Sequence, residues 1–290
     1  MKKMIPLLLA LLVLSGCGGE RAPAETEVLP ENLSVLSETT SLPGTNVVEP
    51  ISAPAMVTEG RFVEADDDLL DYLLSVHSAA GDQDDGRPGL KAELPEAGAA
   101  FYAVPGPASG GDCVLLRWGE SFAEFDWAFG TPCRILPWME CRDIDGDKAD
   151  ELIVDCYWGS GTGVSVEALH IVEKSPDGTL TAYTFPESLW QEQFPALFGA
   201  ARIDGRTFAV LGRELVEFSG PENLDLETAS AGSIAGFDTE GWSGLTFRGA
   251  FCLNVAGGAV PCYVAETSAV VVYQDGVFTL QNFHLYSFEQ

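Results

Sequence analysis

The sequence predicts a mainly β to α+β fold, in which antiparallel sheets and hairpins dominate and about three short helices are added. Short apolar runs that alternate with polar residues recur along the chain, and this period is typical of half-buried strands. Turn dipeptides separate several of these runs and favour tight hairpins. They stand at Asp177-Gly178, Asp204-Gly205 and Asp275-Gly276.

Three segments predict the helices. The first lies within residues 62–80, where aspartates at 66–68 precede apolar residues at helical spacing and favour the positive end of the helix macrodipole. The second covers residues 120–129, where aromatic residues alternate with acids. The third covers residues 186–198, which present an apolar face and in which Pro195 is expected to distort the helix.

Strands are expected over most of the remaining folded sequence. A meander forms the C-terminal part, and a polar loop at residues 221–231 precedes it. The predicted strands are 101–104, 113–118, 138–142, 152–158, 164–172, 180–183, 201–203, 207–211, 214–218, 245–255, 260–265, 269–273 and 277–288.

The N-terminus has the pattern of an export signal. Lys2 and Lys3 precede an apolar run at residues 5–14, which is shorter than the roughly 20 residues that a membrane-spanning helix needs. The run ends in Leu14-Ser15-Gly16-Cys17, which resembles the lipobox of bacterial lipoproteins. The resemblance implies cleavage before Cys17 and a diacylglyceryl group on its sulfur. An ordinary secretory signal with an incidental cysteine is the alternative.

This motif divides the chain into three parts. Residues 1–16 form the lipoprotein signal peptide, and residues 17–59, rich in Glu, Thr, Ser, Pro and Ala, are expected to be a flexible tether. Residues 60–290 form a β-rich extracytoplasmic domain. The lipid on Cys17 is therefore expected to anchor the protein to the cell membrane.

Charge excludes some classes of partner. The 290 residues include 44 acidic and 15 basic side chains, for a formal net charge of −29. Nucleic acids are bound through clustered Lys and Arg, so the composition argues against a nucleic-acid partner. It also argues against electrostatic docking on anionic lipid, and it favours the solubility of a surface-displayed protein.

Six cysteines follow Cys17, and an even number permits disulfides outside the cytoplasm. Spacing favours one pair across the glycine turn at residues 256–258 and one that clamps the stem of the acidic stretch at residues 143–155. Buried thiols are the competing interpretation. The pairs considered are Cys252 with Cys262, Cys141 with Cys156 and, by what remains, Cys113 with Cys133.

The acidic stretch is the sharpest chemical signal in the sequence. Asp143, Asp145 and Asp147 alternate, and Glu151 follows directly before an apolar run. Alternate spacing in a tight loop lets carboxylates converge, and Ca²⁺, which takes about six to eight oxygen ligands, offsets their repulsion. An Asx-rich turn without metal is the competing interpretation. An EF-hand is disfavoured, because no helix is expected before the loop and Val154 stands at the twelfth position.

The same stretch resembles the calcium loop of FG-GAP and VCBS-type repeats, whose pattern is Asp-x-Asp-Gly-Asp-Gly-x-x-Asp/Glu-Leu. Lys148 replaces the glycine at the sixth position, where glycine eases a positive φ. A single copy argues against a seven-bladed propeller. The longer stretch to His170 resembles uncharacterised lipoproteins of Gram-positive gut bacteria, which imply no activity. The ligands implied for a structural Ca²⁺ are the side chains of Asp143, Asp145, Asp147 and Glu151 and the backbone oxygen of Ala149.

Enzyme signatures are weak. Residues 159–163 fit neither a nucleophile elbow nor a phosphate loop, so a glycine turn is expected there. His77, His170 and His284 lie on separate predicted elements, and no zinc motif contains them. The separation of two carboxylates, which identifies a glycosidase, is not visible in a sequence with 44 acids. Most of the six tryptophans are expected in the core.

The sequence therefore favours a non-enzymatic binding or interaction module on the cell surface, lipid-anchored and with a calcium-stabilised loop, whose protein or glycan ligand it does not identify. The alternative is a cell-surface hydrolase acting on glycan or peptidoglycan. A binding module should present an exposed apolar or aromatic patch. A hydrolase should present a cleft that holds two carboxylates, or a histidine near a nucleophile.

Overall fold

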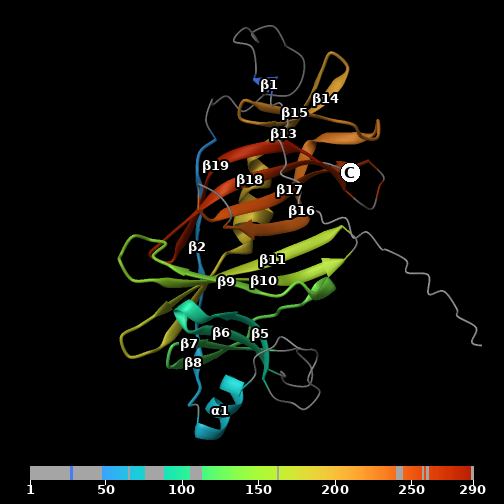
Figure 1. The fold of residues 1–290 in the computed structure, drawn as a ribbon. Coiled ribbons are helices and arrows are strands. Elements are labelled where there is room, and N and C mark those ends of the chain that lie inside the picture. Colours follow the sequence, from blue (N-terminus) through green and yellow to red (C-terminus); the bar gives the residue numbers. More distant parts are fainter. Residues whose placement is uncertain are drawn as a thin grey trace, which may run out of the picture.

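Strands dominate the computed structural model of this chain, and they form three sheets (Figure 1). A single α-helix, α1 (Asp67–Ser75), lies at one end of the described part of the molecule. The mainly β class predicted from the sequence is therefore confirmed, with fewer regular helices than expected. The structure describes residues 27–28, 48–64, 66–75, 88–104, 113–161, 163–239, 244–256, 258 and 261–288.

The largest sheet has ten strands and runs in the order β2-β19-β18-β17-β16-β11-β10-β9, while β12 pairs with both β11 and β3. Its one parallel pairing among the described strands joins β11 to β16, through Ser165 opposite Ile234 and Val166 opposite Ala235. The strands are β2 (Ile51–Pro54), β3 (Met56–Glu59), β9 (Trp138–Arg142), β10 (Glu151–Gly161), β11 (Val164–Lys174), β12 (Leu180–Thr184), β16 (Leu224–Asp238), β17 (Thr246–Val255), β18 (Cys262–Gln274) and β19 (Val277–Ser287).

An N-terminal strap, residues 51–62, closes this sheet on itself. Its first part, β2, pairs with β19, and β3 continues directly from it to pair with β12. Beyond Gly60 the strap enters a second sheet as β4 (Arg61–Phe62), which pairs with β8. Gly60 is needed at this corner, because a Cβ there would lie 2.6 Å from Ala123 Cβ.

The strap corrects the predicted boundary at residue 59. Residues 51–59 are not tether but strands, and Ala53 lies in the main core. The segment escaped prediction because its Ser, Thr, Pro and Ala side chains are mostly exposed and carry little apolar alternation. Farther upstream, β1 (Glu27–Val28) also pairs, with β15. Residues 1–26, including Cys17 and the signal sequence, lie outside the described residues.

The second sheet has five strands and is buried on both faces. One face packs against Leu152, Val154 and Val172 of the largest sheet. The other receives α1, whose Leu73 is buried and whose start is capped by Asp66 Oδ1, which accepts the Leu69 N–H at 2.8 Å. The strands are β4, β8 (Ser121–Phe125), β7 (Cys113–Trp118), β6 (Ala99–Val104) and β5 (Gly89–Leu94), in spatial order.

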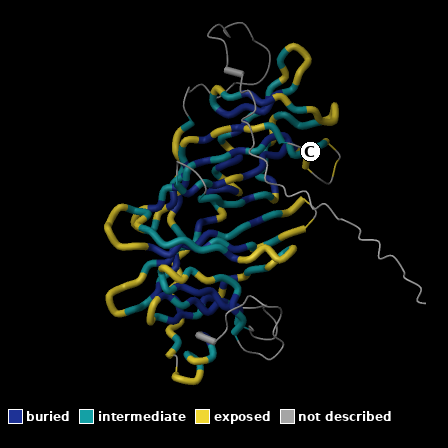
Figure 2. Tube along the Cα trace, in the orientation of Figure 1, coloured by how far each residue is buried: buried dark blue, intermediate teal, exposed yellow. Residues whose placement is uncertain are grey.

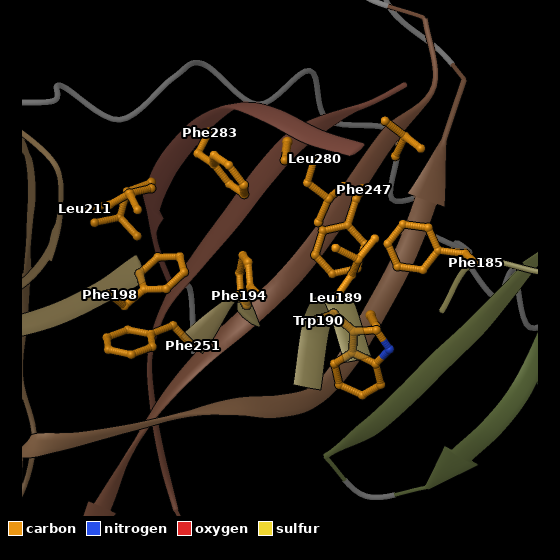
Figure 3. Packing of buried hydrophobic residues seen from close by; sticks show 14 of the residues in the cluster. Phe185, Leu189, Trp190, Phe194, Phe198, Leu211, Phe247, Phe251, Leu280 and Phe283 are labelled. Carbon is orange, nitrogen blue, oxygen red and sulfur yellow. The ribbon is translucent and has the colours of Figure 1, made fainter. Parts of the chain in front are cut away.

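A third, four-stranded sheet covers the opposite end of the molecule (Figures 1 and 2). Between it and the largest sheet lies the main core, in which Phe194 packs edge-on against Phe247 and Phe198 stacks on Phe251 at 4.7 Å (Figure 3). The strands are β1, β15 (Glu214–Phe218), β14 (Arg206–Leu211) and β13 (Phe198–Ile203).

Two predicted segments are wrong. Residues 120–129 begin with β8 rather than a helix, after a tight turn in which Gly119 has φ +64°. The sheet buries Phe122 on one face and Phe125 on the other, so the sequence there shows no clean alternation. The loop expected at 221–231 falls largely within β16, whose small polar residues and two register shifts hide the strand period.

The third predicted helix is short and irregular. Residues 189–193 form a π-helical turn, and Pro195–Leu197 form a 3₁₀ turn before β13 begins at Phe198. The distortion expected from Pro195 is thus present. The two strands expected at 260–265 and 269–273 are one strand, β18. His77 lies outside the described residues, and within them no helix is long and apolar enough to cross a membrane.

Candidate metal centre

The acidic loop joins β9 to β10, two antiparallel strands at the edge of the largest sheet. Arg142, the last residue of β9, lies opposite Glu151, the first residue of β10, so residues 143–150 form the hairpin connection. Strands therefore flank the loop on both sides, whereas an EF-hand loop is flanked by helices. The paired stem fixes where the loop begins and ends.

Three carboxylates converge in this loop. Single oxygen atoms of Asp143, Asp145 and Glu151 all lie within 4.8 Å of one another. Asp147, the fourth predicted side-chain ligand, is not part of this group, and its Oδ1 instead accepts the Ala149 N–H at 2.7 Å. The backbone oxygen of Ala149 stays a prediction from the resemblance.

Backbone donors hold the aspartates in place. Asp143 accepts the N–H of Gly146 at 2.6 Å and that of Lys148 at 3.1 Å, one on each carboxylate oxygen. Asp145 Oδ1 accepts the Asp147 N–H at 3.0 Å. These bonds require a sharply folded backbone, and Lys148 has φ +80° at the position where the repeat pattern has glycine. The loop backbone thus holds the aspartates in a defined arrangement.

Glu151 differs from the aspartates because it is buried, with 3% of its surface exposed. Its Oε2 accepts the Ile144 N–H at 2.9 Å. The pKa of Glu151 is raised to about 6, mainly by burial and also by the charges of Asp145, Asp147 and Asp143, while the Ile144 N–H opposes the rise. A cation among these oxygens would relieve the repulsion, so the residues present fit a hard divalent ion such as Ca²⁺.

The six described cysteines are free thiols in this structure, so the disulfides considered from the sequence stay predictions. The register of β9 and β10 sets Cys141 opposite Leu152 and not opposite Cys156. A register shift in β17 and β18 sets Cys252 opposite Tyr263, and Cys262 opposite Leu253. The competing interpretation of buried thiols fits Cys156 and Cys252.

His170 is a buried structural side chain. Its Nδ1 lies 2.8 Å from Thr184 Oγ1, its Nε2 lies 3.9 Å from Cys156 Sγ, and its ring stacks on Trp127 at 3.9 Å. Burial lowers the pKa of His170 to about 3, so the ring is neutral. Burial likewise raises the pKa of the Cys156 thiol far above its usual value. A protonated thiol closed off from solvent is not an activated nucleophile.

A second carboxyl cluster was missed by sequence reasoning. Asp155 of β10 and Glu167 of β11 form a side-chain hydrogen bond in the strand pair that follows the loop. The only sequence signal was an aspartate inside the apolar run from Leu152 to Cys156. A direct hydrogen bond sets the two groups closer than the roughly 5–9.5 Å that separates the carboxyls of glycosidases.

One surface cavity of about 260 Å³ lies between the strap, β8 and the turn that joins β11 to β12. It is lined by residues 59–62, Phe122, Ala123 and 178–180. Glu59 is the one carboxylate among these residues, and they include neither histidine nor cysteine. The cavity therefore does not provide the two carboxylates expected of a hydrolase cleft.

Comparisons of the chain with protein-family models, with curated proteins and with solved structures found no match.

Proposed function

We propose that this protein is a lipid-anchored extracytoplasmic binding module whose β9–β10 loop is stabilised by Ca²⁺. The observation that carries the metal is the convergence of Asp143, Asp145 and Glu151 in a loop whose backbone already holds the aspartates. All of these ligands are oxygen atoms, the type that Ca²⁺ and Mg²⁺ take. The irregular, partly exposed loop suits the flexible coordination of Ca²⁺ better than the strict octahedron of Mg²⁺.

The loop also connects a bound ion to the core. Ile144, which follows the first aspartate, packs against the main hydrophobic cluster and donates its N–H to Glu151. An ion held by Asp143 and Glu151 would fix both ends of the loop around this residue. The expected role of the metal is therefore structural, to hold the edge of the largest sheet.

Exposed apolar side chains support the binding role. Trp158 is 51% exposed at a register shift in β10, and Phe62 is 71% exposed at the end of the strap. Large apolar groups on a protein surface are typical of contact with a ligand or partner. These two side chains, together with Met56 and Val57 of β3, are the first positions to test against protein and glycan ligands.

The metal is tested by thermal unfolding of the mature chain in Ca²⁺ and in EGTA. A ligand that binds only the folded state stabilises it by RT ln(1 + [L]/Kd), about 2.7 kcal/mol at a hundredfold excess over Kd. We expect a calcium-dependent rise in Tm that Asp145→Ala abolishes. Asp204→Asn, in an exposed turn of the third sheet with φ +50°, is the matched control and should keep the rise. No rise at millimolar Ca²⁺ would reduce the loop to an acidic turn.

The anchor is tested with the full-length chain in a bacterial host. We expect the protein in the membrane fraction, labelled by radioactive fatty acid, and we expect Cys17→Ser to remove the label and release the protein. Label that persists in the Cys17→Ser variant would contradict lipidation at this residue.

A further inference from the structure

Two carboxyl groups meet beside the parallel junction between β11 and β16. Asp155 stands opposite Leu169 and Glu167 stands opposite Tyr157, so the two carboxyl side chains are diagonal neighbours on one face of the β10–β11 pair, close enough for a side-chain hydrogen bond. An ionised carboxylate is an acceptor only, so two carboxyls can form this bond only when one of them carries a proton. A pair of carboxyls placed in this way therefore favours one shared proton.

Glu167 also links the two strands of the junction. Its Oε2 accepts the Phe237 N–H of β16 at 2.8 Å, and it lies 2.7 Å from where a Cβ at Gly236 would stand. The register of this junction contains only two residue pairs, Ser165 with Ile234 and Val166 with Ala235. The Glu167 carboxylate thus adds a third link to a short seam.

The surroundings favour one negative charge rather than two. Burial, followed by the charge of Glu167, raises the pKa of Asp155 to about 9, and Asp155 Oδ1 is buried without a hydrogen-bond partner. The negative charge of Glu167 is better stabilised. Its side chain also bonds to Tyr157 of β10, and the positive charge of Arg248 of β17 lowers its pKa.

Arg248 is the cation that acts on Glu167, and its influence is weak. Arg248 is itself paired with Asp238 of β16 and its side chain is 60% exposed, so water screens its charge. From β9 the residue opposite Asp155 is the uncharged Trp138, and the neighbouring Cys156 thiol stays protonated. A second negative charge on Asp155 would therefore be poorly compensated.

We propose that the Asp155–Glu167 pair is a proton-dependent clasp that holds β11 against β16 and makes the domain tighter in acid than in alkali. When the proton leaves, two anions face each other within hydrogen-bonding distance. Because Asp155 Oδ1 is enclosed by the protein, Glu167 is the group that moves away, and it releases the Phe237 N–H. The seam then depends on its two backbone register pairs alone.

The sign of the pH dependence follows from linkage. The folded-state pKa of Asp155 lies above its unfolded value of 3.8, at about 9. The stabilisation by its proton is complete below the unfolded pKa and is lost progressively as the pH rises through the folded pKa. Across this window the unfolded chain has released the proton and the folded chain keeps it, so this group lowers the folding constant by about tenfold per pH unit.

Asp155→Asn tests the clasp in the mature chain, because the amide keeps a donor for Glu167 and does not titrate. Urea unfolding is measured between pH 7 and pH 9 with EGTA present. The folding constant of the wild type should fall faster than that of Asp155→Asn, and the difference should be about tenfold per pH unit. Glu167→Gln, which removes the charge from the other side, should flatten the profile in the same way. Parallel profiles for the wild type and both variants would overturn the proposal.

A second readout reports on the seam itself. The hydrogen-exchange protection factor of the Phe237 amide should fall above about pH 9 in the wild type and stay constant in Asp155→Asn. The amide of Val172, paired with Leu152 away from the junction, is the internal control. Equal loss of protection at both amides would mean global opening and would contradict a local clasp.

Discussion

Two acidic clusters lie on successive hairpins that share β10, and each keeps neighbouring carboxylates together in a different way. In the loop, Asp143 and Asp145 are half-buried or exposed and are surrounded by backbone N–H groups, with room for an ion between them and Glu151. In the strands, Asp155 and Glu167 have few donors and hold each other directly. Donor supply and burial, rather than residue type, decide whether carboxylates fit a metal or a proton.

Glu151→Ala is the substitution expected to have the largest effect, because it should disrupt the loop cluster and leave the strand cluster intact. It removes the one buried ligand and leaves the Ile144 N–H without its acceptor, which should cost about 2–3 kcal/mol in EGTA, since hydrogen bonds to charged groups contribute about that much. It should also remove the calcium-dependent rise in Tm. Urea unfolding with and without Ca²⁺ measures both effects, and a variant that still responds to Ca²⁺ would exclude Glu151 as a ligand.

His170→Gln should remove a separate pH dependence that is superimposed on that of the Asp155–Glu167 pair. The folded-state pKa of His170 is depressed to about 3, so between that value and 6.5 the unfolded chain binds the extra proton and stability rises with pH. From pH 5 to 6.5 the wild type should therefore gain about 1–2 kcal/mol of stability relative to the variant, since the opposing effect of Asp155 is common to both proteins. His284→Gln, on a side chain that is 60% exposed, is the control and should keep the rise.

Lys148→Gly should increase both the stability of the loop cluster and its affinity for Ca²⁺. Lys148 has φ +80°, which glycine adopts without steric cost, so the variant should be more stable by about 0.5–1 kcal/mol in EGTA. It also removes a positive charge beside the carboxylates and should tighten Ca²⁺ binding, measured by calorimetry. Weaker binding in the variant would indicate that Lys148 orders the loop rather than strains it.

Asp145→Asn should have the smallest effect on the metal-free protein, below about 0.5 kcal/mol, because the amide oxygen can still accept the Asp147 N–H. In Ca²⁺ the variant should lose most of the thermal shift. Asp147→Asn is the matched control, because Asp147 lies outside the converging group. Equal losses in both variants would favour the four-carboxylate set implied by the repeat resemblance.

Sequence reasoning reached the loop but not the strand cluster, and the cause is the range of the contacts. Asp143 to Glu151 lie within one hairpin connection, so local spacing predicts their convergence. Asp155 meets Glu167 and Phe237 only through a register with a shift at Trp158 and a parallel junction some seventy residues along the chain. Neither the register shift nor the long-range pairing produces a recurring pattern of apolar residues in the sequence.

The same limit applies to the fold. Hairpins with Asp-Gly turns were predictable, since the turn and both strands are adjacent in the sequence, as at Asp204-Gly205 and Asp275-Gly276. The strap and β16 were not, because their residues are small, polar or exposed, and their pairing partners lie far away. Burial on both faces hid β8 for a different reason, since it removes the alternation that identifies a strand.

The strap has a consequence for the order in which the chain folds. It is synthesised early, yet Ile51 pairs with Leu280, more than two hundred residues farther along the chain. Contacts this far apart in sequence form late, because the loop between them must first be closed. The hairpins of the second sheet can assemble first, because their strands are neighbours in the sequence, while β2 has no partner until β19 is present. The largest sheet therefore closes only after β19 has been synthesised.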